Sequence, residues 1–136
     1  MKLVYGMGLF MVLMSIFQHS YSQDSTITKR DITWFSDQNM ELHSSTQINA
    51  SCTITTHSSS SIDLNWGGLT TFSILSIDGN WSDPSVDGTL TYHMQYQGKK
   101  GNVVIQRLQG VITLIIDLTL QFPDGMKVNF KINRFE

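Results

Sequence analysis

Apolar and polar residues alternate along most of this chain, and this period of two is the feature that most constrains its fold. Between Gln47 and Thr55 every odd position is polar, and the even positions are Ile48, Ala50, Cys52 and Ile54. Successive side chains of a β-strand point to opposite faces, so the pattern predicts a strand with one buried face. After residue 22 no segment shows a convincing apolar stripe with helical spacing. The chain is therefore expected to be all-β.

Extended over the whole chain, the same pattern predicts eight or nine strands joined by short connections. Their expected ranges are 30–36, 39–44, 47–56, 60–66, 69–78, 88–97, 102–108, 111–122 and 126–135. An antiparallel meander of this kind forms either an up-and-down barrel or a two-layer β-sandwich. We favour the barrel, because consecutive strands can pair as neighbours and closure removes exposed strand edges. The sandwich is the alternative.

Three turn signals set the expected pairing of the last four strands. Residues 98–101 predict a four-residue loop, residues 109–110 a two-residue turn and residues 123–125 a three-residue loop. The first loop places Tyr92 opposite Arg107, and the last places Ile116 opposite Ile132. Together the turns gather one apolar set on a single face: Leu90, Tyr92, Met94, Tyr96, Val103, Ile105, the even positions of 112–122 and those of 126–132. A slip of one residue would turn a strand's apolar set outward.

The first 22 residues have the order of a secretory signal peptide. Lys2 precedes an apolar run of 15 residues, 3–17, and the small residues Ser20 and Ser22 follow it. The run is shorter than the roughly 20 residues that a membrane-spanning helix needs. We expect cleavage before Gln23, a secreted or periplasmic location, and membrane contact only through the transient signal peptide. The remaining 114 residues, 23–136, are expected to form a single all-β domain.

Composition narrows the class of partner. Residues 23–136, which exclude Lys2, contain eight Lys and Arg residues and eleven Asp and Glu residues, so their net charge is −3. The basic residues form no clustered face, which argues against nucleic acid as a partner. Cys52 is the one cysteine, so no disulfide can form within the chain. A lone cysteine is more typical of a bacterial periplasmic protein than of one folded in the endoplasmic reticulum, and its place on the apolar face predicts a structural role.

The sequence offers little for metal binding or catalysis. His43, His57 and His93 have no ligand-like spacing, so we expect surface histidines and neither a metal nor a cofactor. In the expected register no carboxylate faces inward except Glu136, and Asp117 is expected to point outward. Catalysis would need convergent acid, base or metal groups, which argues against an enzyme.

Arg107 and Tyr92 are the candidate ligand-binding residues. The expected register points Arg107 inward between Tyr92 and Ile112, in the same row as Glu136. In a hollow barrel its guanidinium group could hold an anionic ligand. In a filled barrel it would pair with Glu136 or reach solvent at the barrel end.

These observations favour an exported, non-enzymatic β-domain with an accessory, structural or protein-binding role at the cell envelope. The alternative is a small barrel that carries a small apolar or fatty-acid-like ligand. An eight-stranded barrel leaves room for at most one such ligand. The expected partner is therefore either an unknown protein or a small apolar molecule.

Overall fold

In the computed structural model, which describes residues 27–136, the chain forms nine strands and one short 3-10 helix. The helix is η1 (Ile27–Lys29). The strands are β1 (Asp31–Glu41), β2 (Thr46–Ile48), β3 (Cys52–His57), β4 (Ser61–Asn65), β5 (Leu69–Gly79), β6 (Gly88–Tyr96), β7 (Lys99–Leu108), β8 (Val111–Asp117) and β9 (Lys127–Phe135). The expected signal peptide, 1–22, and its cleavage site before Gln23 lie outside the described residues.

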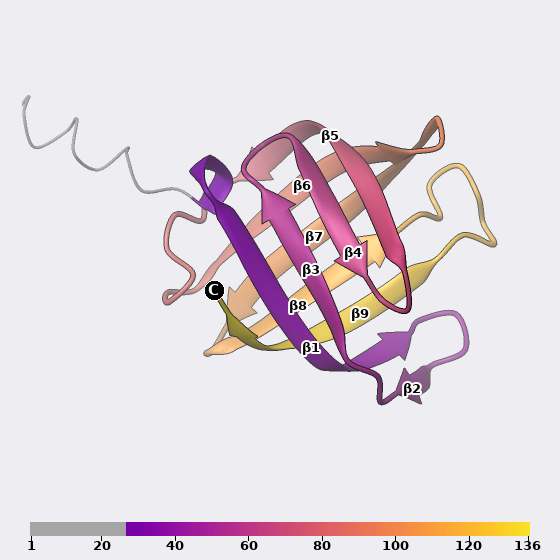
Figure 1. Ribbon diagram of the computed structural model, residues 1–136, viewed down its shortest axis with the longest axis horizontal. Helices are drawn as coiled ribbons and strands as arrows, with labels where there is room; N and C mark the ends of the chain where they lie inside the picture. The colour runs from indigo at the N-terminus through magenta and orange to yellow at the C-terminus, as the bar shows by residue number, and fades with distance from the viewer. Residues whose placement is uncertain (1–26) are drawn as a thin grey trace, which may run out of the picture.

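Eight of these strands close into an up-and-down barrel (Figure 1). From β3 to β9 each strand pairs with the next, and β1 closes the ring by pairing with both β3 and β9. The short strand β2 is added beside the far end of β1. The predicted all-β antiparallel meander and its closure into a barrel are confirmed. The pairing of β1 with β9 excludes the two-layer sandwich.

The alternation of the sequence decides which side chains fill the barrel. Every second residue of β3 and of β8 is buried, and Cys52 is only 5% exposed. The predicted inward face is confirmed along these strands. Asp117 points outward, as predicted, and its carboxylate lies 3.7 Å from the Lys127 ammonium group.

The segment between residues 30 and 57 departs from prediction because β1 bends. The two strands expected at 30–36 and 39–44 are one strand, β1, with register shifts on either side of Ser36. The strand expected at 47–56 is divided into β2 and β3. Bulges of this kind bend a strand and raise its twist. The first part of β1 therefore pairs with β3, and its last residues pair with β2.

The predicted four-residue loop between β6 and β7 is wrong. The connection is the two-residue turn Gln97–Gly98, with φ angles of 51° and 76°. Positive φ at both central residues is the turn conformation that best matches the twist of a hairpin. Tyr96 therefore pairs with Lys99, and the partner of Tyr92 is Val103 rather than Arg107. The register differs from the prediction by four residues, an even number, so the same side chains still face inward.

The predicted end of β8 is also wrong. The strand stops at Asp117, and Ile116 pairs with Val128 instead of Ile132. The Asp117 carboxylate accepts hydrogen bonds from the Thr119 amide and hydroxyl groups, a local arrangement that competes with strand pairing. Residues 118–126 therefore form a loop, which leaves Leu120 and Phe122, both predicted to face inward, exposed.

The predicted turn at 109–110 is confirmed. Leu108 pairs with Val111, and Arg107 pairs with Ile112. Both central residues have positive φ, 51° at Gln109 and 81° at Gly110. This hairpin has the same two-residue form as the one between β6 and β7.

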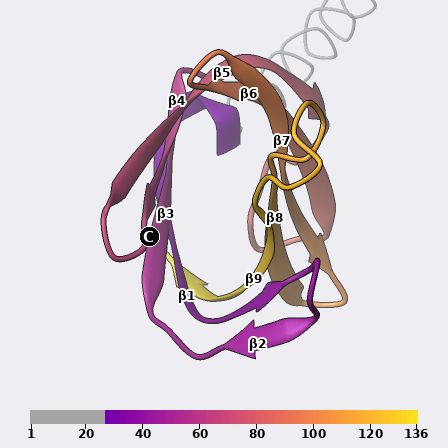
Figure 2. The ribbon, with the colours of Figure 1, turned by 90° about the vertical axis from the view of Figure 1, so that its right-hand side faces the viewer.

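The two ends of the barrel are built differently. At the capped end, formed by η1, residues 80–87 and the turn 109–110, Trp81 stacks on Trp34 with ring centroids 5.9 Å apart. Ile27 of η1 is fully buried there. The opposite end, which we call the mouth, carries the turns 66–68 and 97–98 and the loop 118–126. Figure 2 views the barrel from the side that carries this loop.

Candidate ligand-binding site

A pocket of about 340 Å³ opens at the mouth of the barrel. Strands β4 to β6 and the turn 66–68 supply most of its wall, and residues at the two ends of the loop 118–126 complete it. The lining of this mouth pocket is Leu64, Trp66, Gly68, Thr70, Phe72, Tyr96, Leu118 and Met126. None of these residues is charged. Its volume and apolar lining are those of a small-ligand site at the mouth of a β-barrel.

Two aromatic pairs fix the shape of the mouth pocket. Phe72 meets Tyr96 edge to face, with ring centroids 5.4 Å apart, and Trp66 meets Phe130 in the same way at 5.5 Å. Phe72 and Phe130 are fully buried, whereas Trp66 and Tyr96 are only partly buried. Edge-to-face contacts favour one ring orientation over others. The wall of the pocket is therefore formed before any ligand arrives.

The loop 118–126 is held in place by hydrogen bonds at its base and along its length. The Leu118 amide donates to the Met126 carbonyl at 2.7 Å, and the Gly125 amide donates to the Phe122 carbonyl at 2.8 Å. The Lys100 amide donates to the Gln121 side-chain oxygen at 3.0 Å, which ties the loop to β7. Gly125 is required here, because a Cβ would lie 2.3 Å from the Leu118 carbonyl oxygen.

A smaller side pocket of about 220 Å³ adjoins the mouth pocket. The two share Tyr96 and Leu118. The rest of the side pocket is lined by Gln97, Lys99, Phe122, Asp124 and Gly125. The Lys99 ammonium group lies 3.5 Å from the centre of the Phe122 ring. The mouth therefore combines an apolar recess with a charged rim.

Arg107 lies at the capped end, away from the mouth. It pairs with Gly88 across β6, and its guanidinium group donates to the Pro84 carbonyl at 2.9 Å. Its Nε lies 3.7 Å from the Asp87 carboxylate. The predicted neighbour Tyr92 and the predicted ion-pair partner Glu136 are both wrong: Tyr92 is four residues away along β6, and Glu136 pairs with Arg134 instead. Arg107 therefore fastens residues 80–87 to the barrel.

Tyr92 faces the barrel interior, as predicted, but lines neither the mouth pocket nor the side pocket. It is fully buried, and within residues 27–136 its hydroxyl group has no hydrogen-bond partner. Burial raises the pKa of Tyr92 to about 12. The structure therefore does not bring the two candidate residues, Arg107 and Tyr92, together at a site.

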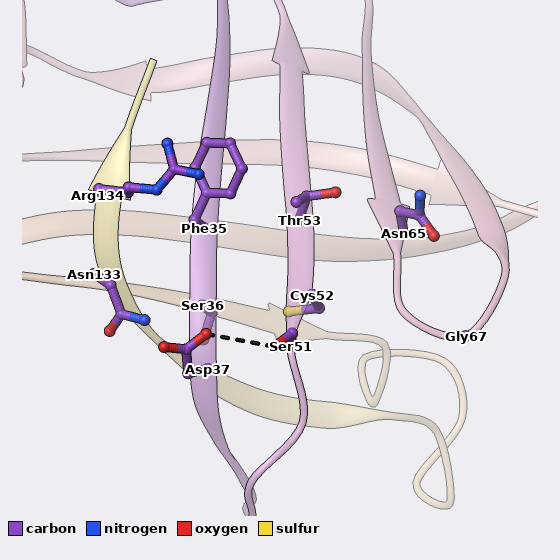
Figure 3. Close-up of a pocket in the computed structure, with 10 residues that line it drawn as sticks. All are labelled: Phe35, Ser36, Asp37, Ser51, Cys52, Thr53, Asn65, Gly67, Asn133 and Arg134. Atoms are coloured by element: carbon purple, nitrogen blue, oxygen red, sulfur yellow. Dashed lines mark hydrogen bonds between the residues drawn. The ribbon is translucent and has the colours of Figure 1, made fainter.

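A further hollow, of about 590 Å³, is a surface groove beside the bend in β1 (Figure 3). We call it the bulge groove, and it is lined by Phe35, Ser36, Asp37, Ser51, Cys52, Thr53, Asn65, Gly67, Asn133 and Arg134. Ser51 donates to Asp37 at 3.5 Å. The Arg134 guanidinium group lies over the Phe35 ring at 3.6 Å and pairs with Glu136. The Phe35 ring and the Arg134 guanidinium group of the bulge groove therefore already contact each other or another protein group.

Cys52 borders the bulge groove but is not a nucleophile in this setting. Burial raises the pKa of its thiol to about 11, so the thiolate is a minor form near neutral pH. The Ser36 side chain opposes this shift only in part. The position agrees with the structural role predicted from the alternation.

Two histidines bridge strands on the outer face of the barrel. His57 contacts Asp31 at 3.1 Å and Asp63 at 2.8 Å, and hydrogen bonding to these carboxylates, Asp31 first, raises the pKa of His57. His93 contacts Asp78 and Asn102. Among the described residues no group of three His, Cys, Asp or Glu side chains is placed to hold a metal ion.

Sequence reasoning missed the mouth as a site. Trp66 continues the alternation of Ile62 and Leu64, so its inward direction was readable in the pattern. Lys99 was assigned to a loop, because the turn before it was taken to be longer. The pocket is open because β8 ends at Asp117, whereas the turn signals predicted a strand that continues to residue 122.

Within residues 27–136 there is no helix with the length and apolar character needed to cross a membrane. No protein-family model, curated protein or solved structure matches the chain. The geometry of the mouth is therefore the basis for a functional proposal.

Proposed function

We propose that this protein is an exported, non-enzymatic barrel that binds one small apolar ligand at its mouth. The observation that carries the proposal is the mouth pocket of about 340 Å³, which has no charged residue in its lining. Transfer of an apolar molecule from water into such a recess is favourable in proportion to the area buried. The export signal predicted from residues 1–22 favours a site of action in the periplasm or outside the cell.

The rim of the mouth supports the same proposal. Leu120 and Phe122, on the loop 118–126 beside the pocket, are 60% and 43% exposed, and Leu69, the first residue of β5 after the turn 66–68, is 69% exposed. Large apolar side chains gathered at one place on a surface commonly mark a site of binding. Phe122 also lines the side pocket, so its ring extends the apolar surface that a ligand would meet on entry.

Titration with the uncharged fluorescent probe N-phenyl-1-naphthylamine tests the proposal. We expect saturable binding with a dissociation constant of roughly 1–100 µM, the affinity typical of a small apolar ligand in a partly open pocket. Thr70→Trp places an indole ring in the pocket and should abolish binding. Ser73→Trp is the matched control, because Ser73 lies on the outward face of the same strand. Absence of saturable binding by the wild type would refute the proposal.

Binding of a protein partner at the envelope is the second candidate. The same exposed residues, Leu69, Leu120 and Phe122, favour it, since aromatic and aliphatic anchors dominate protein interfaces. A photo-crosslinking amino acid at position 120 should then trap a specific partner during export. The same group at position 108, which is equally exposed but lies at the capped end, should not. Crosslinking at both positions alike would count against a specific interface at the mouth.

A further inference from the structure

Lys99 occupies an unusual position for a lysine, because it belongs to the inward-facing row of β7. It lies two residues before Gly101, which is buried together with Val103 and Ile105 on the interior face. Side chains at every second position of a strand share a face. The row therefore ends at the mouth with the cation of Lys99, while the next residue, Lys100, belongs to the outward-facing row.

The charge of Lys99 has no carboxylate partner within residues 27–136. Its ammonium group instead contacts the Phe122 ring, 3.5 Å from the ring centre. Asp124 also lines the side pocket but does not pair with Lys99. By contrast, Lys127, which also lies at this end of the barrel, pairs with Asp117. Lys99 is thus a cation held at the edge of an apolar recess and available to an anion.

The two pockets of the mouth are adjacent through Tyr96 and Leu118. A single molecule can therefore place an apolar tail in the mouth pocket and a polar head in the side pocket. The head would then meet Lys99, and a carboxylate forms charge-assisted hydrogen bonds with an ammonium ion that are roughly twice as strong as those between neutral groups.

We propose that the ligand is an amphiphilic anion, an apolar chain or ring with one carboxylate, and that Lys99 receives the carboxylate. This inference rests on the proposed binding of an apolar ligand at the mouth and specifies its chemical class. It moves the anion-binding role expected of Arg107 to the opposite end of β7. Arg107 has the Asp87 carboxylate and the Pro84 carbonyl as partners, whereas in the part of the chain that the structure describes Lys99 contacts an aromatic ring and no carboxylate.

Octanoate and 1-octanol test the inference, because both have an unbranched chain of eight carbon atoms but only octanoate is charged. Each compound is titrated into the mature protein, residues 23–136, and its binding is measured from the displacement of N-phenyl-1-naphthylamine. We expect the wild type to bind octanoate about five- to tenfold more tightly than octanol at low salt. The preference should shrink at 0.5 M NaCl, because salt screens exposed charges.

Lys99→Met should remove the preference, weakening octanoate binding about tenfold while changing octanol binding less than twofold. Lys100→Met is the matched control and should leave both affinities unchanged, because this side chain points away from the pocket. Lys99→Arg should retain the preference. Asp124→Asn should strengthen octanoate binding about twofold, because it removes a like charge from the side pocket.

The outcomes separate the two proposals. If octanol and the neutral probe bind but octanoate has no advantage, or if Lys99→Met behaves like the wild type, the role of Lys99 is refuted and the apolar site stands. If only octanoate binds, and Lys99→Met abolishes it, the role of Lys99 is supported and a purely apolar site is refuted. If neither octanol, octanoate nor the probe binds, both proposals are refuted. Circular dichroism of Lys99→Met and Lys99→Arg establishes that the variants are folded.

Discussion

The capped end and the mouth of the barrel contain similar residues, but the capped end is filled and the mouth is open. Each end has a tryptophan, a connection of eight or nine residues (80–87 or 118–126) and a basic residue on the inward-facing row of β7. At the capped end Trp81 is 2% exposed, stacks on Trp34 and donates its indole N–H to the Val86 carbonyl at 2.7 Å. At the mouth Trp66 is only partly buried and borders a pocket.

Whether side chains fill an end of this barrel therefore depends on the course of the loop that connects the strands there. Residues 80–87 fold over the barrel, and Trp81 packs so closely on Gly88 that a Cβ there would lie 2.1 Å from the indole ring. The loop 118–126 instead holds Leu120 and Phe122 out in solvent. The same contrast applies to the two cations: Arg107 has a carboxylate and a carbonyl as partners, whereas within residues 27–136 Lys99 contacts an aromatic ring and no carboxylate.

The largest effect is expected from removal of the tryptophan that closes the capped end. Trp81→Ala should lower the free energy of unfolding by about 3–5 kcal/mol, because it leaves a cavity against Trp34 and Gly88. Phe122→Ala at the mouth should cost less than about 1 kcal/mol, since that ring is 43% exposed. Urea denaturation of both variants measures the difference. Equal losses would mean that the two ends contribute alike to stability.

A smaller effect of opposite sign is expected in the filled interior. The buried Tyr92 hydroxyl has no hydrogen-bond partner among residues 27–136. Tyr92→Phe should therefore leave the free energy of unfolding unchanged or raise it by up to about 1 kcal/mol. At the mouth, Tyr96→Phe should be within about 0.5 kcal/mol of the wild type, because the Tyr96 hydroxyl is reached by solvent and by Gln97. A loss above 1 kcal/mol for Tyr92→Phe would reveal a partner for this hydroxyl.

A pH-dependent effect is expected on the outer face near the capped end. The pKa of His57 is raised by Asp31 and Asp63, so its folded-state value lies above 6.5. A raised histidine pKa contributes stability that is fully present below the unfolded value and is lost as the pH rises through the folded value. His57→Gln should therefore cost up to about 1 kcal/mol at pH 6 and close to nothing at pH 9.

Urea denaturation of the wild type and His57→Gln at the two pH values tests this. Asp63 stays ionised over the range, because its pKa is held below its usual value, first by the Thr71 hydroxyl. High salt should reduce the difference at pH 6. A cost for His57→Gln that is the same at pH 6 and pH 9 would show that the charge of His57 does not matter.

The smallest effect is expected where β8 meets the mouth. Asp117→Asn should change the free energy of unfolding by roughly 0.5 kcal/mol or less, as substitutions on the outer face of a barrel usually do, because this side chain points away from the interior. The amide retains an acceptor for the Thr119 amide and loses only the attraction to Lys127, 3.7 Å away. Chemical denaturation measures this change. A loss of several kcal/mol in the free energy of unfolding would instead mean that the Asp117 carboxylate is needed to hold the loop 118–126 in its conformation.

The candidate site was only partly predictable. The alternation placed Leu64, Trp66 and Tyr96 on the inward face, and the structure puts all three at the mouth pocket. Arg107 was expected to face Tyr92, because residues 98–101 contain two glycines and have the composition of a loop. In the structure Gln97 adopts a positive φ and Lys99 begins β7. Side-chain composition alone did not distinguish these two turns.

The amino-acid sequence correctly predicted the secondary-structure class, the inward face of each strand of the final meander, the burial of Cys52 and the turn at 109–110. It could do so because a period of two depends only on local side-chain order. Tertiary structure decided the register, the end of β8 and therefore the opening at the mouth. A slip of four residues leaves every side chain on the same face, so alternation cannot detect it. Packing can, because at Gly101 a Cβ would lie 2.6 Å from the Asp117 carbonyl oxygen, a contact that exists only once the barrel has formed.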